Sequence, residues 1–267
     1  IIGLQEVRRP FDNPSGTTPG GGKYRLFHTA CEVLSNGAPN LGVGIMVRTH
    51  LVPTIVSLRL LSPRLLIAKF RGAQRNLTVC VAHAPHSDAS PEAREDFYTT
   101  FSEALSDHNE RVTKVVLMDA NTGPGEWRHG RSHIIGPHGI PYAKKDLAKD
   151  DNHFQFNHFC WNHNLCVGHT WFKHRESQKL TFYPNASHSG QPRDMDHILR
   201  DGRSSSCLED VRSLPELTIS THDKFVDGYQ PGHRMVIAKI RCRLRKPEPK
   251  IKIQTYLRSE CMDPDVQ

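Results

Sequence analysis

The stretch that most constrains the fold is residues 115–121, which read Val-Val-Leu-Met-Asp-Ala-Asn. Four apolar residues, two of them β-branched, predict a buried strand, and the turn-forming run Asn121-Thr122-Gly123-Pro124 ends it. On an extended chain Asp119 and Asn121 project from the same face, roughly 7 Å apart. A carboxylate and an amide presented together at a strand end suit a hydrated Mg²⁺ ion and a phosphate oxygen. The alternative interpretation is a strand followed by an ordinary Asx-type turn.

Composition bounds the class of protein and its partners. At 267 residues the chain can form one large domain or two small ones, and its 37% apolar and 24% charged residues are ordinary for a globular protein. The formal charge is +7, the isoelectric point is near 9.1, and 17 histidines add positive charge as the pH falls. This balance favours a polyanionic partner.

Cysteine usage and apolar patterning indicate the compartment. Seven cysteines form an odd, scattered set, which favours reduced thiols in the nucleus or cytoplasm. No apolar run approaches the length of a membrane span, so we predict no membrane partner. The chain opens on Ile1-Ile2-Gly3-Leu4, mid-strand by its pattern and without an initiator methionine, so we expect a fragment or an incomplete gene model.

The order of predicted elements is typical of a layered α/β protein. Ser90-Pro91 predicts a helix start, and Ala93, Phe97, Phe101 and Leu105 form its apolar stripe. A second helix is predicted over 154–164. Strands are predicted at 1–4, 24–27, 42–47, 65–70, 77–82, 170–172, 180–183, 195–200 and 235–244. After residue 245 the pattern breaks, so we predict one domain over 1–245 and a basic tail or linker over 246–267.

Polar residues recur at the predicted strand ends in a fixed order: Glu6, His83, Asp119, Asn121, Thr181, Asp196 and His233. Their order and flanks resemble the endonuclease/exonuclease/phosphatase family, whose metal-dependent members cleave phosphodiester or phosphomonoester bonds. The matching motifs are Leu4-Gln5-Glu6-Val7-Arg8, Met118-Asp119-Ala120-Asn121, Met195-Asp196-His197-Ile198-Leu199 and Gly232-His233-Arg234. The resemblance covers residues 1 to about 244.

A narrower resemblance is to the endonuclease domains of non-LTR retrotransposons and to the craniofacial-development-like proteins related to them. Four stretches carry it, in one order and at compatible spacings: Gly42-Val43-Gly44, Ile135-Gly136-Pro137-His138-Gly139, Cys160-Trp161-Asn162-His163 and Leu180-Thr181-Phe182-Tyr183-Pro184. The resemblance implies a four-layer α/β sandwich, with two mixed β-sheets packed face to face and helices outside. It also implies a Mg²⁺-dependent endonuclease, with Mn²⁺ as an alternative ion, that acts on DNA. A reverse transcriptase domain downstream in the full gene is the further partner it implies.

The resemblance assigns a role to each polar residue, and phosphodiester hydrolysis requires these roles. Glu6 is the metal ligand. Asp119 orients or deprotonates the attacking water, while Asn121 and Thr181 donate to phosphate oxygens. Asp196 holds His233 in one tautomer, and His233 then stabilises charge on the phosphate. His83 stands where tyrosine is usual, and its imidazole can also donate a hydrogen bond.

Other departures from the family pattern keep alternatives open. The family's first strand, which brings an asparagine to the metal site, would precede residue 1. Met118 and Ala120 replace glycine and phenylalanine, and Gly232 replaces an aspartate in the metal environment. One alternative is therefore a catalytically degenerate copy that acts as a nucleic-acid-binding or interaction module. Another is a phosphatase or lipid phosphodiesterase on the same scaffold.

Zinc is a further possibility raised by the sequence, on Cys160, His163, Cys166 and His169. These residues lack a second Cys or His pair at zinc-site spacing, so we do not predict a zinc site.

Overall fold

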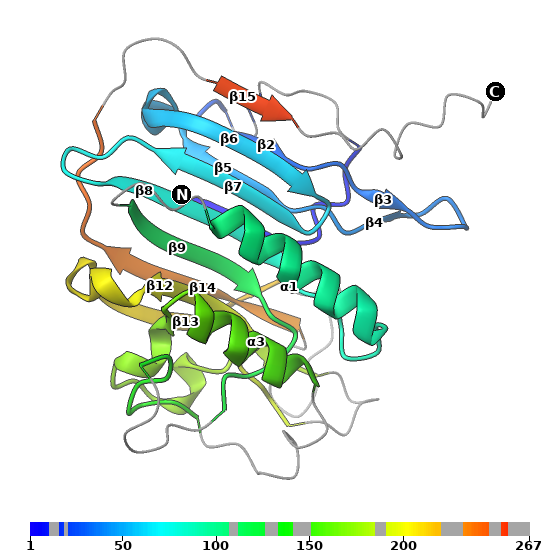
Figure 1. Ribbon diagram of the computed structural model, residues 1–267, viewed down its shortest axis with the longest axis vertical. Coiled ribbons are helices and arrows are strands. Elements are labelled where there is room, and N and C mark those ends of the chain that lie inside the picture. Colours follow the sequence, from blue (N-terminus) through cyan, green and yellow to red (C-terminus); the bar gives the residue numbers. More distant parts are fainter. Residues whose placement is uncertain are drawn as a thin grey trace. The chain divides into compact units, whose positions relative to one another are not determined.

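The structure, a computed structural model, describes residues 1–10, 16–18, 21–106, 112–125, 133–140, 151–184, 191–219 and 232–245, and the backbone of 252–255. The chain divides into two compact units, whose helices and strands are labelled in Figure 1. Unit 1 comprises Ile1–His83 and Arg243–Gln267, and unit 2 comprises Ala84–Cys242. Within the described ranges, no helix is long and apolar enough to cross a membrane.

Unit 1 is built from strands. One antiparallel sheet has the order β1-β5-β2, formed by β1 (Ile2–Leu4), β5 (Gly44–Arg48) and β2 (Tyr24–His28). A second set has the order β8-β7-β6-β15, formed by β8 (Asn76–His83), β7 (Leu65–Phe70), β6 (Ile55–Ser62) and β15 (Lys252–Thr255). Because β15 runs parallel to β6 while the other pairs are antiparallel, this set is mixed. The remaining elements are a β3 (Glu32–Val33) and β4 (Pro39–Asn40) pair and the 3-10 helix η1 (Thr49–Thr54).

Unit 2 combines helices with two antiparallel sheets. The first has the order β10-β12-β9, formed by β10 (Leu165–Val167), β12 (Asp196–Asp201) and β9 (Val112–Asp119). The second has the order β11-β14-β13, formed by β11 (Phe182–Tyr183), β14 (Gly232–Ile240) and β13 (Leu208–Ile219). The helices are α1 (Pro91–Leu105), α3 (Asp151–Asn162) and the 3-10 helices η2 (Gly168–Trp171), η3 (Glu176–Gln178) and η4 (Gly202–Cys207).

Helix α1 begins where the sequence predicts. The Ser90 hydroxyl accepts a hydrogen bond from the backbone N–H of Ala93 at 3.2 Å, and proline occupies the first helical position, where no N–H is needed. Phe97 and Phe101 are buried, and the Phe101 ring lies 4.6 Å, centre to centre, from the ring of Phe159 in α3. The predicted apolar stripe therefore packs α1 against α3, although Ala93 itself is exposed.

Strand β12 shows how unit 2 is layered. On one face of the strand, the His197 ring stacks on Phe156 of α3, with 5.1 Å between ring centres. On the other face, Asp196 pairs with His233 of β14, in the second sheet. Helices, first sheet and second sheet thus follow one another, and the predicted α/β sandwich is confirmed.

Several local predictions need correction. The strand predicted over 170–172 is wrong: the strand is β10, and Gly168–Trp171 is the helix η2. The Thr170 hydroxyl explains this, because it donates to the carbonyl of Val167 at 2.6 Å and accepts the N–H of Gly136 at 2.8 Å. Helix α3 starts three residues earlier and ends two residues earlier than predicted. Strands β6 and β13 were not predicted. Of the predicted tail, residues 252–255 form β15, and the rest lies outside the described residues.

Candidate active site

Three of the predicted site residues meet in unit 2. Asp119 ends β9 and lies directly opposite Asp196, the first residue of β12, in the antiparallel register. His233 comes from β14, and its Nδ1 lies 2.9 Å from Oδ2 of Asp196. One ligand atom from each of the three residues lies within 4.8 Å of the other two. The fold thus gathers residues that are far apart in the sequence.

The Asp196–His233 pair forms the open side of this group. The side chain of His233 is 37% exposed and that of Asp196 is 18% exposed, whereas Asp119 is only 6% exposed. The carboxylate of Asp196 can only accept, so Nδ1 of His233 must donate, which fixes the tautomer or protonation state of the ring. Nε2 then points away from Asp196, where it can reach a bound group.

Asn121 reaches Asp119 through a turn, not along an extended strand as the sequence predicted. Its backbone φ is +51°, and its N–H donates to Oδ1 of Asp119 at 2.9 Å. This is the Asx-type turn that was the alternative interpretation. The side-chain amide of Asn121 donates from Nδ2 to the carbonyl of Ala84 at 2.8 Å. Asparagine tolerates a positive φ better than most residues, which suits it to this position.

Residues 120–125, which we call the β9 loop, are all buried. Buried backbone carbonyls need donors, and two histidines supply them. Nε2 of His197 in β12 donates to the carbonyl of Thr122 at 2.9 Å, and Nδ1 of His153 in α3 donates to that of Gly123 at 2.9 Å. The loop that carries Asn121 is therefore held from two elements.

Thr181 is buried, and its hydroxyl oxygen accepts the backbone N–H groups of Met195 at 2.8 Å and Asp196 at 2.9 Å. These bonds fix the chain where it enters β12. Only the hydroxyl hydrogen of Thr181 is left to donate to a phosphate oxygen.

The two other predicted residues, Glu6 and His83, belong to unit 1. Glu6 follows β1 with a φ of +53°, and its Oε2 accepts from Nη2 of Arg8 at 2.8 Å. His83 ends β8 and is 1% exposed. Its N–H donates to the carbonyl of Arg64 at 3.0 Å, and its own carbonyl accepts from Nη1 of Arg64 at 3.3 Å.

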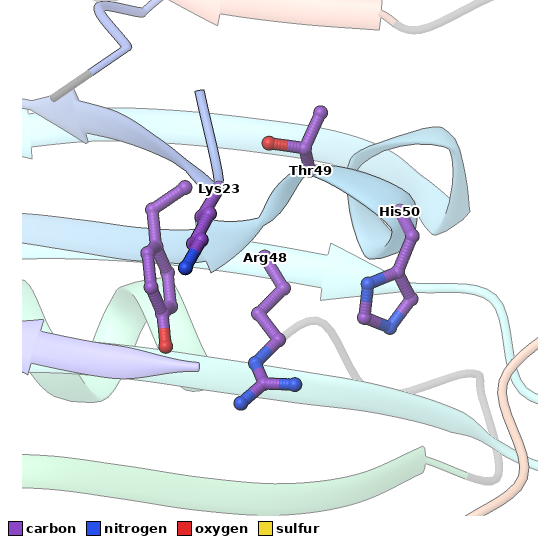
Figure 2. Close-up of a pocket in the computed structure, with 5 residues that line it drawn as sticks. Lys23, Arg48, Thr49 and His50 are labelled. Atoms are coloured by element: carbon purple, nitrogen blue, oxygen red, sulfur yellow. The ribbon is translucent and has the colours of Figure 1, made fainter. Parts of the chain in front are cut away.

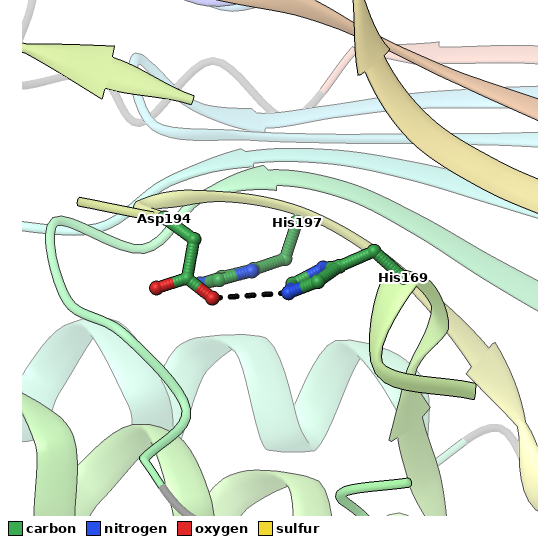
Figure 3. A group of neighbouring side chains, drawn as sticks. All are labelled: His169, Asp194 and His197. Atoms are coloured by element: carbon green, nitrogen blue, oxygen red, sulfur yellow. Dashed lines mark hydrogen bonds and ion pairs between the residues drawn. The ribbon is translucent and has the colours of Figure 1, made fainter. Parts of the chain in front are cut away.

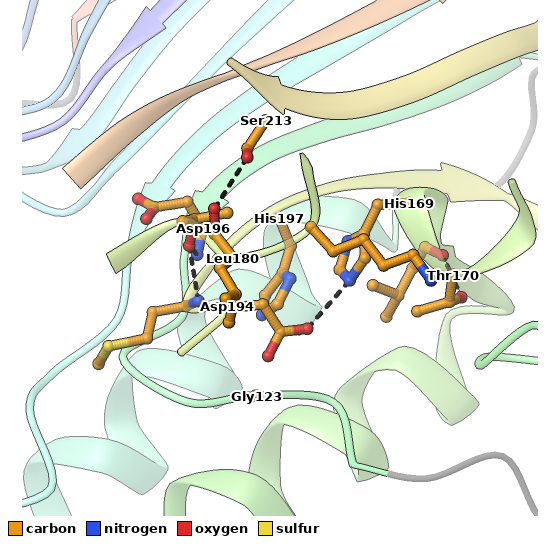
Figure 4. A network of polar contacts seen from close by, with 12 residues as sticks. Gly123, His169, Thr170, Leu180, Asp194, Asp196, His197 and Ser213 are labelled. Atoms are coloured by element: carbon orange, nitrogen blue, oxygen red, sulfur yellow. Dashed lines mark hydrogen bonds and ion pairs between the residues drawn. The ribbon is translucent and has the colours of Figure 1, made fainter. Parts of the chain in front are cut away.

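A second, fully buried cluster in unit 2 was not predicted (Figure 3): His169, Asp194 and His197. Nε2 of His169 lies 3.0 Å from Oδ2 of Asp194, and the two imidazole rings are stacked with centres 5.6 Å apart. Figure 4 shows the cluster beside Asp196. The spacing of Asp194, Asp196 and His197 could have drawn attention to this segment, but nothing in the sequence distinguished His169 from the other histidines.

Burial determines the protonation of this cluster. It lowers the pKa of His169 well below its usual value, with smaller contributions from His197 and from the charge of Lys179, and it lowers the pKa of His197 to about 4. Burial also raises the pKa of Asp194 well above its usual value. The two imidazoles are therefore neutral near pH 7, and burial disfavours the charged form of Asp194. We interpret it as support for β12 and the β9 loop, because the nearby charge of Lys179 opposes a cation.

The zinc possibility receives no support within the described part of the chain. Cys160 and Cys166 are buried, and burial raises the pKa of both thiols. The Cys166 thiol donates to the carbonyl of His133 at 2.9 Å. His169 pairs with Asp194 instead, and the groups with metal-binding geometry among the described residues contain no cysteine.

The Asp119, Asp196 and His233 group fits a divalent cation. Carboxylate oxygens are the ligands that Mg²⁺ and Mn²⁺ prefer, and an imidazole nitrogen is acceptable to Mn²⁺. The partial exposure of Asp196 and His233 leaves the group open to water and to a substrate. Two carboxylates and an oriented imidazole can together hold a cation, accept a proton from water and donate to a phosphate oxygen.

No protein-family model and no curated protein matches the chain. Solved structures do. The 3′ phosphatase NExo from Neisseria, bound to a product DNA hairpin, aligns with a TM-score of 0.59 at 15% identity, over 90% of this chain and 88% of its own. An AP endonuclease from Archaeoglobus fulgidus aligns with a TM-score of 0.55 at 14% identity, over 89% and 87%. The catalytic domain of human Nocturnin gives 0.51 at 14% identity, over 91% and 79%. The chain therefore has the fold of the endonuclease/exonuclease/phosphatase structures whose motifs its sequence resembles.

Proposed function

We propose that this chain is a metal-dependent phosphoester hydrolase and, more narrowly, a Mg²⁺-dependent DNA endonuclease domain of retrotransposon type. The observation that carries the proposal is the gathering of Asp119, Asp196 and His233 within 4.8 Å on the fold shared by nucleases and phosphatases. The four sequence stretches that carry the narrower resemblance support the retrotransposon type, and the net charge of +7 favours a nucleic acid.

The side chains divide the work of hydrolysis. Asp119, held in place by the N–H of Asn121, takes a proton from the attacking water. Asp196 orients His233 through Nδ1, so Nε2 donates to a non-bridging phosphate oxygen as negative charge develops there. Thr181 keeps Asp196 in register through the backbone N–H bonds that its hydroxyl accepts.

A bound Mg²⁺ or Mn²⁺ supplies charge compensation on the phosphate. Among the residues of unit 2, the carboxylates of Asp119 and Asp196 are suited to hold it. Glu6 remains the metal ligand predicted from the sequence, and His83 remains a predicted hydrogen-bond donor to the substrate.

The specific observation that favours a second candidate function is Gly232, because the family motif has an aspartate there. Without that carboxylate the cation is held more weakly. The alternative is therefore a degenerate copy that binds nucleic acid without cleaving it. A phosphatase on the same scaffold is a further candidate, since one solved structure with this fold is described as a 3′ phosphatase.

The test is relaxation of supercoiled plasmid with Mg²⁺, with Mn²⁺ and with chelator. We expect nicking only with metal, and we expect Asp119→Ala and His233→Ala each to lower the rate by about 10²–10⁴-fold. A matched control is available in unit 2, where His174 pairs with Asp210 at 2.6 Å outside the candidate site. His174→Ala should nick at the wild-type rate. Equal nicking by wild type and Asp119→Ala would exclude the proposed role.

A nuclear or cytoplasmic location and a downstream reverse transcriptase domain are also proposals. The location is supported by the cysteines, because the six within the described residues are free thiols. Sequencing the gene on the 3′ side of the region that encodes this chain would show whether a reverse transcriptase domain is encoded there.

A further inference from the structure

A second candidate binding place lies in unit 1, in a pocket lined by Lys23, Tyr24, Arg48, Thr49 and His50 (Figure 2). We call it the basic pocket. Its walls come from the start of β2 and the end of β5, where Tyr24 and Arg48 are directly paired. The N–H of Thr49 donates to the carbonyl of Lys23 at 3.0 Å, and the Thr49 hydroxyl donates to that of Gly22. The backbone around the pocket is therefore tied down.

The charge of this pocket has one sign. Lys23, Arg48 and His50 are all exposed, and the lining contains no carboxylate. Within the described ranges, none of these three side chains makes a salt bridge with an acidic residue. Cations that gather without counter-charges repel one another, and an anion placed among them relieves that repulsion. The pocket is thus suited to a phosphate group.

An aromatic wall adds a second kind of contact. Tyr24 is half-buried, which fixes its ring, and the guanidinium carbon of Arg48 lies 6.0 Å from the ring centre. Cationic side chains that follow a backbone, with an aromatic ring on which a base can stack, are the pattern by which proteins hold single-stranded nucleic acid. Double-stranded DNA would not expose its base faces to Tyr24.

The basic pocket is distinct from the end of the same sheet that leads to Glu6, the metal ligand predicted from the sequence. Leu4, two residues before Glu6, pairs with Gly44 at the start of β5, whereas Arg48 ends that strand. Four residues separate the two positions, which is about 13 Å along an extended strand. The pocket therefore lies at the opposite end of the β1-β5-β2 sheet from Glu6.

We propose that the basic pocket binds the phosphate backbone of single-stranded nucleic acid, with Lys23, Arg48 and His50 around a phosphate and Tyr24 against a base. The proposal concerns binding alone, so it holds whether or not the chain hydrolyses phosphoesters.

The experiment measures binding of the full chain, carrying Asp119→Ala to prevent cleavage, to a fluorescent oligothymidine of about 12 nucleotides, which is within the usual site size. Fluorescence anisotropy is recorded over a series of NaCl concentrations. Adding Lys23→Glu and Arg48→Glu together should lower the affinity at least tenfold. The log–log salt slope should fall by about 1.4, because each phosphate contact contributes about 0.7 on a single strand. Adding Tyr24→Leu instead should weaken binding while leaving the slope unchanged.

The control applies the same change in net charge elsewhere in unit 1, as Arg71→Glu with Arg75→Glu, two exposed residues outside the pocket. This pair should shift affinity far less. An equal loss in both double variants would show a general charge effect and overturn the proposal, as would an unchanged affinity for the Lys23 and Arg48 variant. If that double variant does not fold, Lys23→Glu alone gives the same readout, with a slope change of about 0.7.

Discussion

Gly232 has a φ of +119°, a backbone conformation that residues with a Cβ rarely adopt. It directly precedes His233, whose Nδ1 is bonded to Asp196. The motif of the family that the sequence resembles has an aspartate at this position, whereas this chain has a glycine in a backbone conformation that favours glycine. Restoring the carboxylate must therefore strain the backbone.

We predict two opposite effects of Gly232→Asp. The new carboxylate should lower the Mg²⁺ concentration needed for half-maximal nicking, while the strained backbone should cost about 1–3 kcal/mol of unfolding free energy. A metal titration of the nicking rate and urea unfolding measure the two effects. Gly232→Ala separates them, since it should lose similar stability without any gain in metal affinity. A titration that is the same for Gly232→Asp and wild type would show that residue 232 does not face the cation.

Individual site residues could be predicted from the sequence where they lie within a recognisable motif. Asp119, Asp196 and His233 could be named because each has a recognisable flank, and the structure places them together. The conformation of Asn121 was mispredicted, because the spacing argument assumed an extended chain where the backbone turns to a positive φ. His169 was invisible because its partner, Asp194, lies 25 residues away, and no local pattern encodes that contact.

At the level of secondary-structure elements, side chains of β12 and α3 together position the β9 loop, which carries Asn121. His197 of β12 and His153 of α3 each donate to a carbonyl of the β9 loop, and Asn157 of α3 donates to that of Pro124 at 3.3 Å. None of these side chains needs to touch a substrate. Under the proposed function they are positioning residues, whose effect on hydrolysis passes through the loop.

We predict that His197→Phe lowers kcat about 10- to 100-fold with little change in KM, because small displacements of catalytic groups have effects of this size. Phenylalanine keeps the ring that stacks on Phe156 but has no donor for the carbonyl of Thr122. His197→Gln offers an amide donor near the position of Nε2 and should recover part of kcat. Steady-state nicking kinetics measure both. If glutamine is no better than phenylalanine, the hydrogen bond to Thr122 is not what positions the loop.

Elements with strong local signals were predicted well. β7 has the predicted bounds, Leu65–Phe70, and α1 starts at its predicted proline. β13 was missed because it contains Pro215 and several charged residues, and its pairing with β14 shifts register between Leu214 and Thr218. A bulged strand with proline gives no clean alternation to recognise.

For the molecule as a whole, the buried histidines couple stability to pH. Burial lowers the pKa of His197 to about 4, below the value near 6.5 of an unfolded chain. Between these values the unfolded state binds more protons, so stability is fully present above about pH 6.5 and is lost as the pH falls towards 4. The shift of His169 has the same sign. Asp194 acts in the opposite sense. Because its pKa is raised in the folded protein, its contribution to stability is lost as the pH rises.

We predict that the unfolding free energy of wild type falls between about pH 6.5 and 4, and that His197→Phe reduces this slope by up to about 1.4 kcal/mol per pH unit. Comparing the two proteins isolates the histidine from the other titrating groups. Urea unfolding can be followed by tryptophan fluorescence, since Trp161 and Trp171 both belong to unit 2. Parallel pH profiles for the two proteins would contradict the assigned protonation of His197.

The α/β class could be predicted because a strand–helix–strand order is visible in local periodicity. The division into two compact units could not. The segment after Arg243 returns to unit 1, where β15 pairs in parallel with β6, nearly 200 residues earlier in the chain. A pairing between segments this far apart cannot be recognised from the residues of either segment alone.

The alternation of side chains between the two faces of β12 limits which insertions and deletions the chain can tolerate in evolution. Adjacent residues, Asp196 and His197, face opposite sides of one sheet, the first towards His233 and the second towards Phe156. Inserting or deleting a single residue before them would exchange the two sides, placing a carboxylate in the apolar interior and an interior imidazole beside His233. Substitutions in β12 can be accommodated one at a time, but a change in its length cannot. In related sequences, the number of residues from Met195, whose N–H binds Thr181, to Asp201 at the end of β12 should therefore stay fixed even where the residues themselves are substituted.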